Sequence, residues 1–191
     1  MRLETLGRTA TERSALARAA QSLDERYDVV RKIAREPDFV GILEEFVGRL
    51  QRAFGSVEKV RGKRILDLAA GSNTSRSPKT GERTALFEPW FCRLLLELGA
   101  EAVAVDIGDL EAERFEHHAA DLSQIGALDF LPTASFDGVQ DSRLFGSPEF
   151  REAHPDRDGD ERIRAELRRQ ERRVLKPGGV VIHSDEPARQ I

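Results

Sequence analysis

Two short apolar runs each end in residues whose chemistry suits a bound ligand. Ile65–Ala70 leads directly into Gly71–Asn73, and Ala102–Val105 ends in Asp106. A glycine turn after a strand lets the backbone approach a ligand where larger side chains would collide. A carboxylate at the end of the next strand can accept hydrogen bonds from both vicinal hydroxyls of a ribose. The pattern indicates a nucleotide-like ligand, although a strand followed by a glycine turn is about as often purely structural.

The elements that must position these residues alternate between strand and helix. Apolar runs predict five strands, amphipathic or charged segments predict the helices between them, and the polar segment 74–87 predicts a loop. This alternation favours an α/β fold with a doubly wound, mostly parallel sheet. The strands are expected at 65–70, 102–106, 115–121, 135–141 and 180–183, and the helices at 89–99, 125–130 (a weak one) and 161–175.

Further helices are expected before the first strand. Apolar residues recur at helical spacing from Thr9 to about Arg35, which predicts one long helix or two short ones. Pro37 breaks this pattern, and an amphipathic helix follows from Phe39 to Phe54. We therefore divide the chain into an N-terminal helical segment, 1–57, and an α/β core, 58–191, within one domain overall.

The composition argues against several classes of protein. Charged residues make up 34% of the 191 residues, the two signs are interspersed, and the formal net charge is -4, so a nucleic-acid partner is disfavoured. The chain has no apolar run of about 20 residues and no signal-peptide core, which predicts a cytoplasmic protein without a membrane partner. Cys92 is the only cysteine, so an intramolecular disulfide is impossible, and its apolar neighbours predict burial.

Five motifs in order resemble those of the class I S-adenosylmethionine-dependent methyltransferases, a family with a Rossmann-like fold. The resemblance extends from about Gly62 to Asp185, roughly two thirds of the chain, and the acid of its first motif is Asp67. The order and spacing of the five motifs together are more specific than any one of them. They are the glycine turn at 65–73, the acid at 106, the acid at 121, the start of the fourth strand at 136–139, and the turn and fifth strand at 175–182.

The resemblance implies S-adenosyl-L-methionine as the cofactor and S-adenosyl-L-homocysteine as the product. Ala69, Gly71 and Asn73 stand where the fullest form of the first motif has glycine. Asp106 matches the ribose-binding acid, and Asp121 matches the acid that lies near the adenine amino group. The cofactor-binding residues that the resemblance implies are Asp67, Ala69, Gly71, Ser72, Asn73, Asp106, Ile107, Asp121, Leu122 and Gln140.

Three features depart from the family pattern. Of the three glycine positions, only that of Gly71 holds glycine. Asp106 follows Gly71 by 35 residues rather than the about 20 of a compact dinucleotide fingerprint, because residues 74–87 are inserted between them. The chain also stops at Ile191, just after the fifth strand, so we expect a sheet that lacks the terminal strand pair. A homo-oligomer, another partner or the N-terminal helices would then complete the sheet.

The end of the fourth predicted strand holds the candidates for catalysis. Methyl transfer from a sulfonium mainly requires that a nucleophile be held in line and kept from water, and a general base is needed only for a protonated nucleophile. In the family, the positions of Gln140, Asp141 and Ser142 face the methyl-donor end of the cofactor, and Asp141 is the candidate catalytic residue. The alternative for Asp141 is a carboxylate that caps a turn.

The acceptor is expected to be a small molecule, and two polar segments are candidates for its walls. The insertion 74–87, with Arg76, Lys79, Arg83 and the nearby Trp90, is long enough to act as a lid, and 142–160 would form the other wall. The basic residues hint at an anionic acceptor such as a carboxylate, whereas solvated surface loops are the equally weighted alternative.

No metal site is expected. His117 and His118 are interpreted as partly buried neutral histidines of the third strand. His154 and the neighbouring aspartates lack the remainder of a calcium loop.

Two other functions compete with methyl transfer. A nicotinamide-dependent oxidoreductase shares the order of strand, glycine turn, helix, strand and acid, but the G-x-G-x-x-G spacing and a second domain are missing. A noncatalytic S-adenosylmethionine-binding or scaffold protein with a degraded methyltransferase fold is favoured by the short C-terminal part of the sheet. Fold resemblance alone does not decide between them.

Overall fold

The computed structural model, which describes residues 10–28, 39–77, 80–141, 144–146, 157–182 and 189–190, is built on a six-stranded sheet. Its strands are β1 (Arg64–Leu68), β2 (Glu101–Asp106), β3 (Glu116–Ala119), β4 (Phe136–Asp141), β5 (Leu175–Ile182) and β6 (Arg189–Gln190). Their spatial order is β3-β2-β1-β4-β5-β6, with β1 to β5 parallel and β6 antiparallel to β5. The expected Rossmann-like, doubly wound and mostly parallel sheet is confirmed.

The direction in which the sheet grows reverses between β1 and β4. The chain adds β2 and β3 on one side of β1 and then returns to add β4 and β5 on the other side. Leu68 pairs with Val105 of β2 and with Asp141 of β4, so the carboxyl ends of these three strands share one edge. Open α/β sheets bind ligands outside this edge, at the point of reversal. The topology therefore gathers there the residues that follow β1, β2 and β4.

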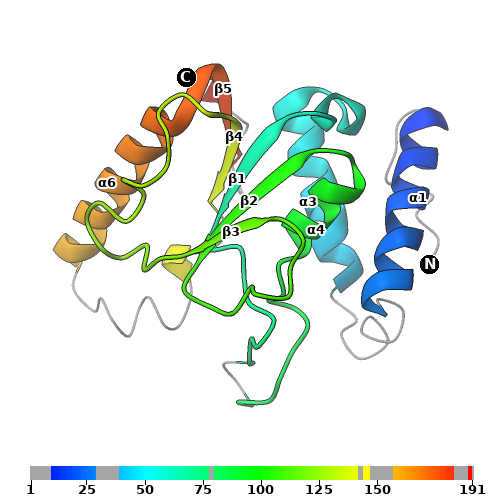
Figure 1. Ribbon diagram of the computed structural model, residues 1–191, viewed down its shortest axis with the longest axis horizontal. Helices are drawn as coiled ribbons and strands as arrows, with labels where there is room; N and C mark the ends of the chain where they lie inside the picture. The colour runs from blue at the N-terminus through cyan, green and yellow to red at the C-terminus, as the bar shows by residue number, and fades with distance from the viewer. Residues whose placement is uncertain are drawn as a thin grey trace.

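Helices cover both faces of the sheet, as Figure 1 shows. Two helices, α3 and α4, pack directly on one face, α1 packs outside α4, and α6 covers the opposite face. Short 3-10 helices, η1 and η2, lie before β1 and after β4. The bounds are α1 (Ala10–Tyr27), α3 (Phe39–Phe54), η1 (Val57–Val60), α4 (Trp90–Glu97), η2 (Leu144–Gly146) and α6 (Arg157–Val174).

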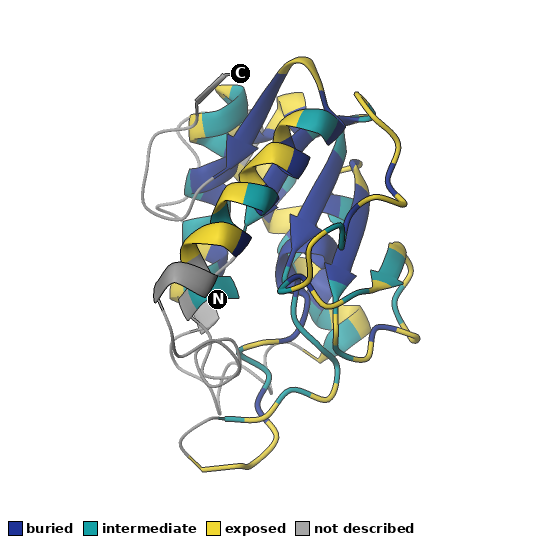
Figure 2. Ribbon diagram, turned by 90° about the vertical axis from the view of Figure 1, so that its left-hand side faces the viewer, coloured by how far each residue is buried: buried dark blue, intermediate teal, exposed yellow. Residues whose placement is uncertain are grey.

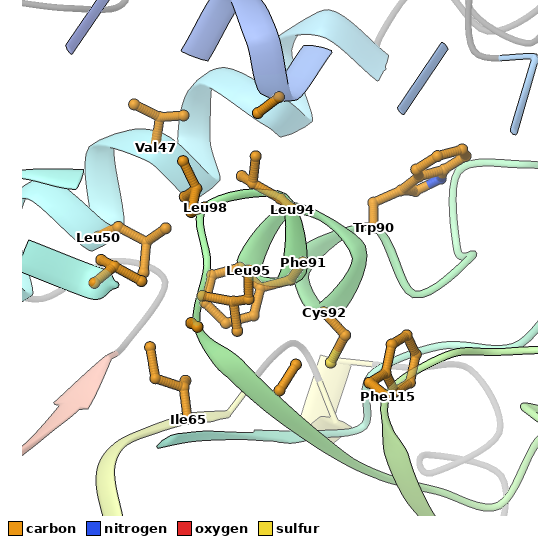
Figure 3. Close-up of a cluster of buried hydrophobic side chains, with 14 of the residues drawn as sticks. Val47, Leu50, Ile65, Trp90, Phe91, Cys92, Leu94, Leu95, Leu98 and Phe115 are labelled. Carbon is orange, nitrogen blue, oxygen red and sulfur yellow. The ribbon is translucent and has the colours of Figure 1, made fainter. Parts of the chain in front are cut away.

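Apolar side chains form one buried cluster on each face of the sheet. Successive residues of β1 enter opposite clusters, Ile65 on the side of α3 and α4 and Leu66 on the side of α6, because side chains alternate along a strand. Figure 3 shows the first cluster, in which Phe91 and Leu95 of α4 and Leu50 of α3 lie on the same side of the sheet as Ile65. The central strands are the most completely buried part of the chain (Figure 2).

Several observed elements differ from the expected ones. Residues 125–130, expected as a weak helix, form successive turns, in which Gly126 adopts a φ of 79° that a right-handed helix excludes. The third strand contains only four residues, and the fifth begins at Leu175, ahead of its Pro-Gly-Gly turn. Of the helix expected over 9–35, the described part is α1, and residues 29–38 lie outside the described residues.

The described part of the sheet ends in a short antiparallel strand. Among the described residues, a single strand of two residues, β6, follows β5. No helix in the described ranges is long and apolar enough to cross a membrane.

Candidate functional site

The turn after β1 is held in a strained, left-handed conformation. Ala69 has a φ of 57° and Gly71 a φ of 101°, and the N–H of Ala69 donates to the carbonyl of Val105 at 2.9 Å. A left-handed φ costs a non-glycine residue about 1–2 kcal/mol, and such strain clusters at ligand sites. The conformation explains why glycine suits both positions. In this chain alanine occupies the first of them and accepts the strain.

Asp106 links the turn after β1 to the turn after β2. Its Oδ2 accepts the N–H of Gly71 at 2.9 Å, and its Oδ1 accepts the N–H of Gly108 at 2.7 Å. A carboxylate has about four acceptor sites, so these two bonds do not by themselves exclude bonds to a ribose. The capping and ribose-binding interpretations of this residue are therefore compatible, and Asp106 supports the turn whether or not a ligand is bound.

The Cα of Gly71 lies close to protein backbone. A Cβ added there would lie 2.2 Å from the carbonyl oxygen of Phe87, far inside van der Waals contact. From the sequence, we expected glycine at position 71 because the ligand would lie close to the backbone there. In the structure the close approach is between the turn and the end of the insertion 74–87.

Ser72 and Asn73 fasten the glycine turn to the loop that follows β2. The Oγ of Ser72 accepts the N–H of Asp109 at 3.0 Å, and the N–H of Asn73 donates to the Asp109 carbonyl at 2.9 Å. The side-chain oxygen of Asn73 accepts from Arg93 at 2.8 Å. Ser72 and Asn73, both predicted to bind the cofactor, thus stabilise the turn through hydrogen bonds within the protein.

A buried ion network beneath the two turns was not foreseen from the sequence. Arg93 of α4 donates to Glu88 at 2.6 Å and to Glu113 at 2.7 Å, and all three side chains are almost fully buried. Its guanidinium also stacks over Trp90 and over Tyr27 of α1, whose hydroxyl donates to Glu113 at 3.4 Å. A charge inside the apolar run of α4 was the available signal, because a buried charge requires partners.

Asp67 and Gln140 lie beneath the turn after β1, enclosed by protein. Both are buried, and the Nε2 of Gln140 donates to Oδ1 of Asp67 at 3.3 Å, while the Sγ of Cys92 lies 3.6 Å from Oδ2. Burial raises the pKa of Asp67 to about 7, although both of these contacts and the charge of Arg49 lower it. Burial likewise raises the pKa of the Cys92 thiol, which is enclosed as expected.

The residues predicted for the adenine side of the site lie at the ends of β2 and β3. Ile107, directly after Asp106, is 76% exposed, which is unusual for a large apolar side chain. Asp121 is exposed and accepts from the Ser123 backbone and hydroxyl, and Leu122 is buried. An exposed isoleucine beside a carboxylate offers an apolar surface for a planar ring.

Asp141 ends β4 on the face that α6 covers. It is half-buried, and the nearby carboxyl group of Glu171 in α6 is 3% exposed. Burial, reinforced by the negative charge of Asp141, raises the pKa of Glu171 to about 8. Within the described residues no hydrogen bond reaches this carboxyl group. Sequence reasoning missed Glu171 because it lies in a strongly charged helix; Ser142 lies outside the described residues.

The proposed acceptor walls are only partly described. Arg76 and Arg83 are exposed and form an antiparallel bridge, but Trp90, which was expected near the acceptor, is buried and donates to the carbonyl of Ala85. Trp90 therefore belongs to the core, as Figure 3 shows. Lys79 and most of 142–160, including His154, lie outside the described residues.

The histidines of β3 have ordinary protein partners. His117 and His118 are partly buried, and their rings lie within hydrogen-bond distance of the Phe115 carbonyl and the Glu116 carboxylate. No cluster of three or more metal-ligating side chains occurs in the described ranges.

Comparison with known proteins finds likeness in structure and none in sequence. No protein-family model and no curated protein matches the chain. Methyltransferases occur among its structural neighbours. A putative S-adenosyl-L-methionine-dependent methyltransferase from Methanococcus maripaludis has a TM-score of 0.45 and 12% identity over 90% of this chain and 62% of its own.

Two further solved structures resemble the chain more weakly. The trans-methyltransferase CalH, in complex with S-adenosylhomocysteine, has a TM-score of 0.37 and 19% identity over 66% of this chain and 33% of its own. The CurJ carbon methyltransferase has a TM-score of 0.36 and 15% identity over 92% of this chain and 51% of its own. The chain thus spans between one third and just under two thirds of these proteins.

Proposed function

We propose that this chain binds S-adenosylmethionine and transfers its methyl group to a small-molecule acceptor. The observation that carries the proposal is the bond from the N–H of Gly71 to Asp106, which joins the strained turn after β1 to the end of β2 at the reversal point of the sheet. Such an arrangement would let the turn backbone and the carboxylate of Asp106 contact one nucleoside. The motif order read from the sequence supports the same assignment.

Each turn contributes a different part of the cofactor site. The backbone from Ala69 to Asn73 would line the side of the amino-acid moiety, Asp106 would accept hydrogen bonds from the ribose hydroxyls, and Ile107 would cover one face of the adenine. Asp121, at the end of β3, would face the adenine edge. When bound, the sulfonium supplies an activated methyl group that needs no further activation by the protein.

Asp67 and Gln140 support the site from below. Their mutual bond ties β1 to β4 directly under the turn, so that the turn is held by side chains as well as by its own backbone. Asp67 and Gln140 are therefore positioning residues, which act through the turn. The contacts to the cofactor itself would then be made by the turn backbone and by Asp106.

Asp141 is the group best suited to take a proton from an acceptor. It ends β4 beside the turn, and the buried Glu171 behind it retains its own proton at neutral pH. An acceptor that loses its proton before methylation would give it to Asp141.

The alternative of a noncatalytic relative also has an observation in its favour. Both carboxylate oxygens of Asp106 accept backbone N–H groups, as they would in a purely structural cap. Turnover separates the two functions. Incubation with S-adenosylmethionine and a panel of small acids, amines and phenols should produce acceptor-dependent S-adenosylhomocysteine, and binding without any turnover would favour the noncatalytic protein.

Binding itself is tested by calorimetry with S-adenosylhomocysteine, NAD and NADP. We expect micromolar affinity for S-adenosylhomocysteine and no detectable binding of the nicotinamide cofactors. Asp106→Ala should weaken binding about tenfold to a hundredfold, since hydrogen bonds to a charged acceptor contribute about 1.5–3 kcal/mol. Glu101→Ala, which removes an exposed acid at the opposite end of β2, is the matched control.

A lower stability of Asp106→Ala is not a test of the ribose contact, because the variant also loses the hydrogen bonds from two backbone N–H groups to the carboxylate. Asp106→Asn keeps one acceptor oxygen and should bind with intermediate affinity. Unchanged affinity in both variants would remove the ribose contact from the proposal. Binding of NAD with no binding of S-adenosylhomocysteine would overturn the proposal as a whole.

A further inference from the structure

An arginine of α3 carries a charge that the described residues neutralise only in part. Arg49 is 2% exposed, and its Nη2 donates to the carboxylate of Glu45, one helical turn earlier. Its Nε and Nη1 have no hydrogen-bond partner within the described part of the chain. A buried guanidinium with unsatisfied donors is destabilising, because it has lost water without gaining an equivalent partner. An anion that reached these donors would remove this cost.

The position of α3 brings Arg49 beneath the carboxyl edge of the sheet. The C-terminal end of α3 leads through η1 to the start of β1, and there Phe54 packs over Gly138 of β4. Arg49 precedes Phe54 by five residues, or about 7.5 Å along the helix axis, in the direction of the carboxyl edge. Its charge acts on Asp67, at the end of β1. Arg49 therefore lies nearer than Phe54 to the carboxyl edge of the sheet, and its guanidinium is buried on the side of Asp67.

The neighbouring carboxylates do not supply the missing partner. Asp67 is contacted by Gln140 and Cys92 and makes no hydrogen bond to Nε or Nη1 of Arg49, and burial raises the pKa of Asp67 to about 7. Glu45 contacts one of the three guanidinium nitrogens and is itself about one third exposed. The five N–H donors of an arginine can serve a second acceptor group in addition to Glu45.

We propose that Arg49 binds the carboxylate of the acceptor, so that the substrate class is a small carboxylic acid. The inference that the ligand is a methyl acceptor rests on the proposed function. The inference that the ligand carries a carboxylate rests on Arg49 alone. A monoanion matches the site, because Glu45 already provides one negative charge and a phosphate dianion would be repelled. Charge-assisted hydrogen bonds in a desolvated site are strong enough to select a carboxylate over its neutral amide.

The test is binding of acetate and benzoate to the full chain, measured by calorimetry at constant ionic strength. Acetamide and benzamide are the neutral counterparts, and inorganic phosphate is the competing anion. We expect benzoate to bind at least about tenfold more tightly than benzamide and than phosphate. Arg49→Gln should lose this preference. Arg52→Gln, which removes an exposed arginine of the same helix, should keep it.

Folding of the variant does not limit the test, because the comparison of benzoate with benzamide uses the unaltered chain. Equal binding of benzoate and benzamide, tighter binding of phosphate, or unchanged benzoate affinity in Arg49→Gln would each overturn the proposal. If the chain binds S-adenosylhomocysteine but not benzoate, this inference alone is overturned. If it binds benzoate but not S-adenosylhomocysteine, the proposed function is overturned.

Discussion

Replacing Glu171 by glutamine should remove a large pH dependence from the stability of this protein. In the native state the buried carboxyl group has a pKa of about 8, against 4.5 for the free side chain. Between these two values the native state holds a proton that the unfolded state has released, so the free energy of unfolding falls as the pH rises. At about 1.4 kcal/mol for each pKa unit, the wild type loses about 5 kcal/mol between pH 4.5 and pH 8 from this group alone.

The variant isolates this contribution. Glutamine cannot ionise, so Glu171→Gln and the wild type should have similar stability near pH 4.5, and the variant should become more stable by several kcal/mol above pH 8. Asp67, whose pKa is raised from 3.8 to about 7, makes the stability of both proteins decline between these values, and its contribution cancels in the difference. The difference in unfolding free energy should therefore grow steadily from pH 5 to pH 8.

Urea unfolding at a series of pH values between 4.5 and 9 measures this difference directly. Glu161→Gln, at an exposed position of the same helix, controls for the loss of one charge from α6 and should follow the wild type. Parallel decline of the wild type and Glu171→Gln would refute the raised pKa. A variant that is less stable at every pH would instead show that the carboxyl group has an essential hydrogen-bond partner.

Two further predictions concern the turn after β1 and the network beneath it. A left-handed alanine costs about 1–2 kcal/mol, and Gly71→Ala should destabilise the fold by more than this because its Cβ would meet the Phe87 carbonyl. Gly62→Ala, where the φ is 71° and no atom lies within 4 Å of the added Cβ, should show the backbone cost alone. Equal melting temperatures of the two variants would contradict this account. Arg93→Met should lower the stability by about 3–5 kcal/mol by leaving the Glu113 carboxylate buried without its ion pair, and thermal unfolding within one degree of the wild type would refute that role.

The local sequence is sufficient to predict the strands and the turn of the candidate site. A short apolar run has few alternatives to a buried strand, and the turn residues after Ile65–Leu68 and the acid at the end of β2 follow from the chain order alone. The sequence also contained the evidence against residues 125–130 as a helix. Gly126 interrupts that segment, and only the positive φ that it adopts was not visible from its residue type.

Tertiary structure decided the roles of the buried polar side chains. Tyr27 and Glu113 are 86 residues apart, and their contact depends on the packing of α1 beside the loop after β2. Whether Arg49, Arg93 or Glu171 is solvated or enclosed depends likewise on which helix face meets the sheet. Arg49 and Glu171 lie in helices with several other charges, so their residue types alone do not distinguish them from exposed neighbours, whereas Arg93 lies in an apolar run. The energy of an ionised group depends on how much water and how many partners surround it, and this is fixed only when distant segments pack together.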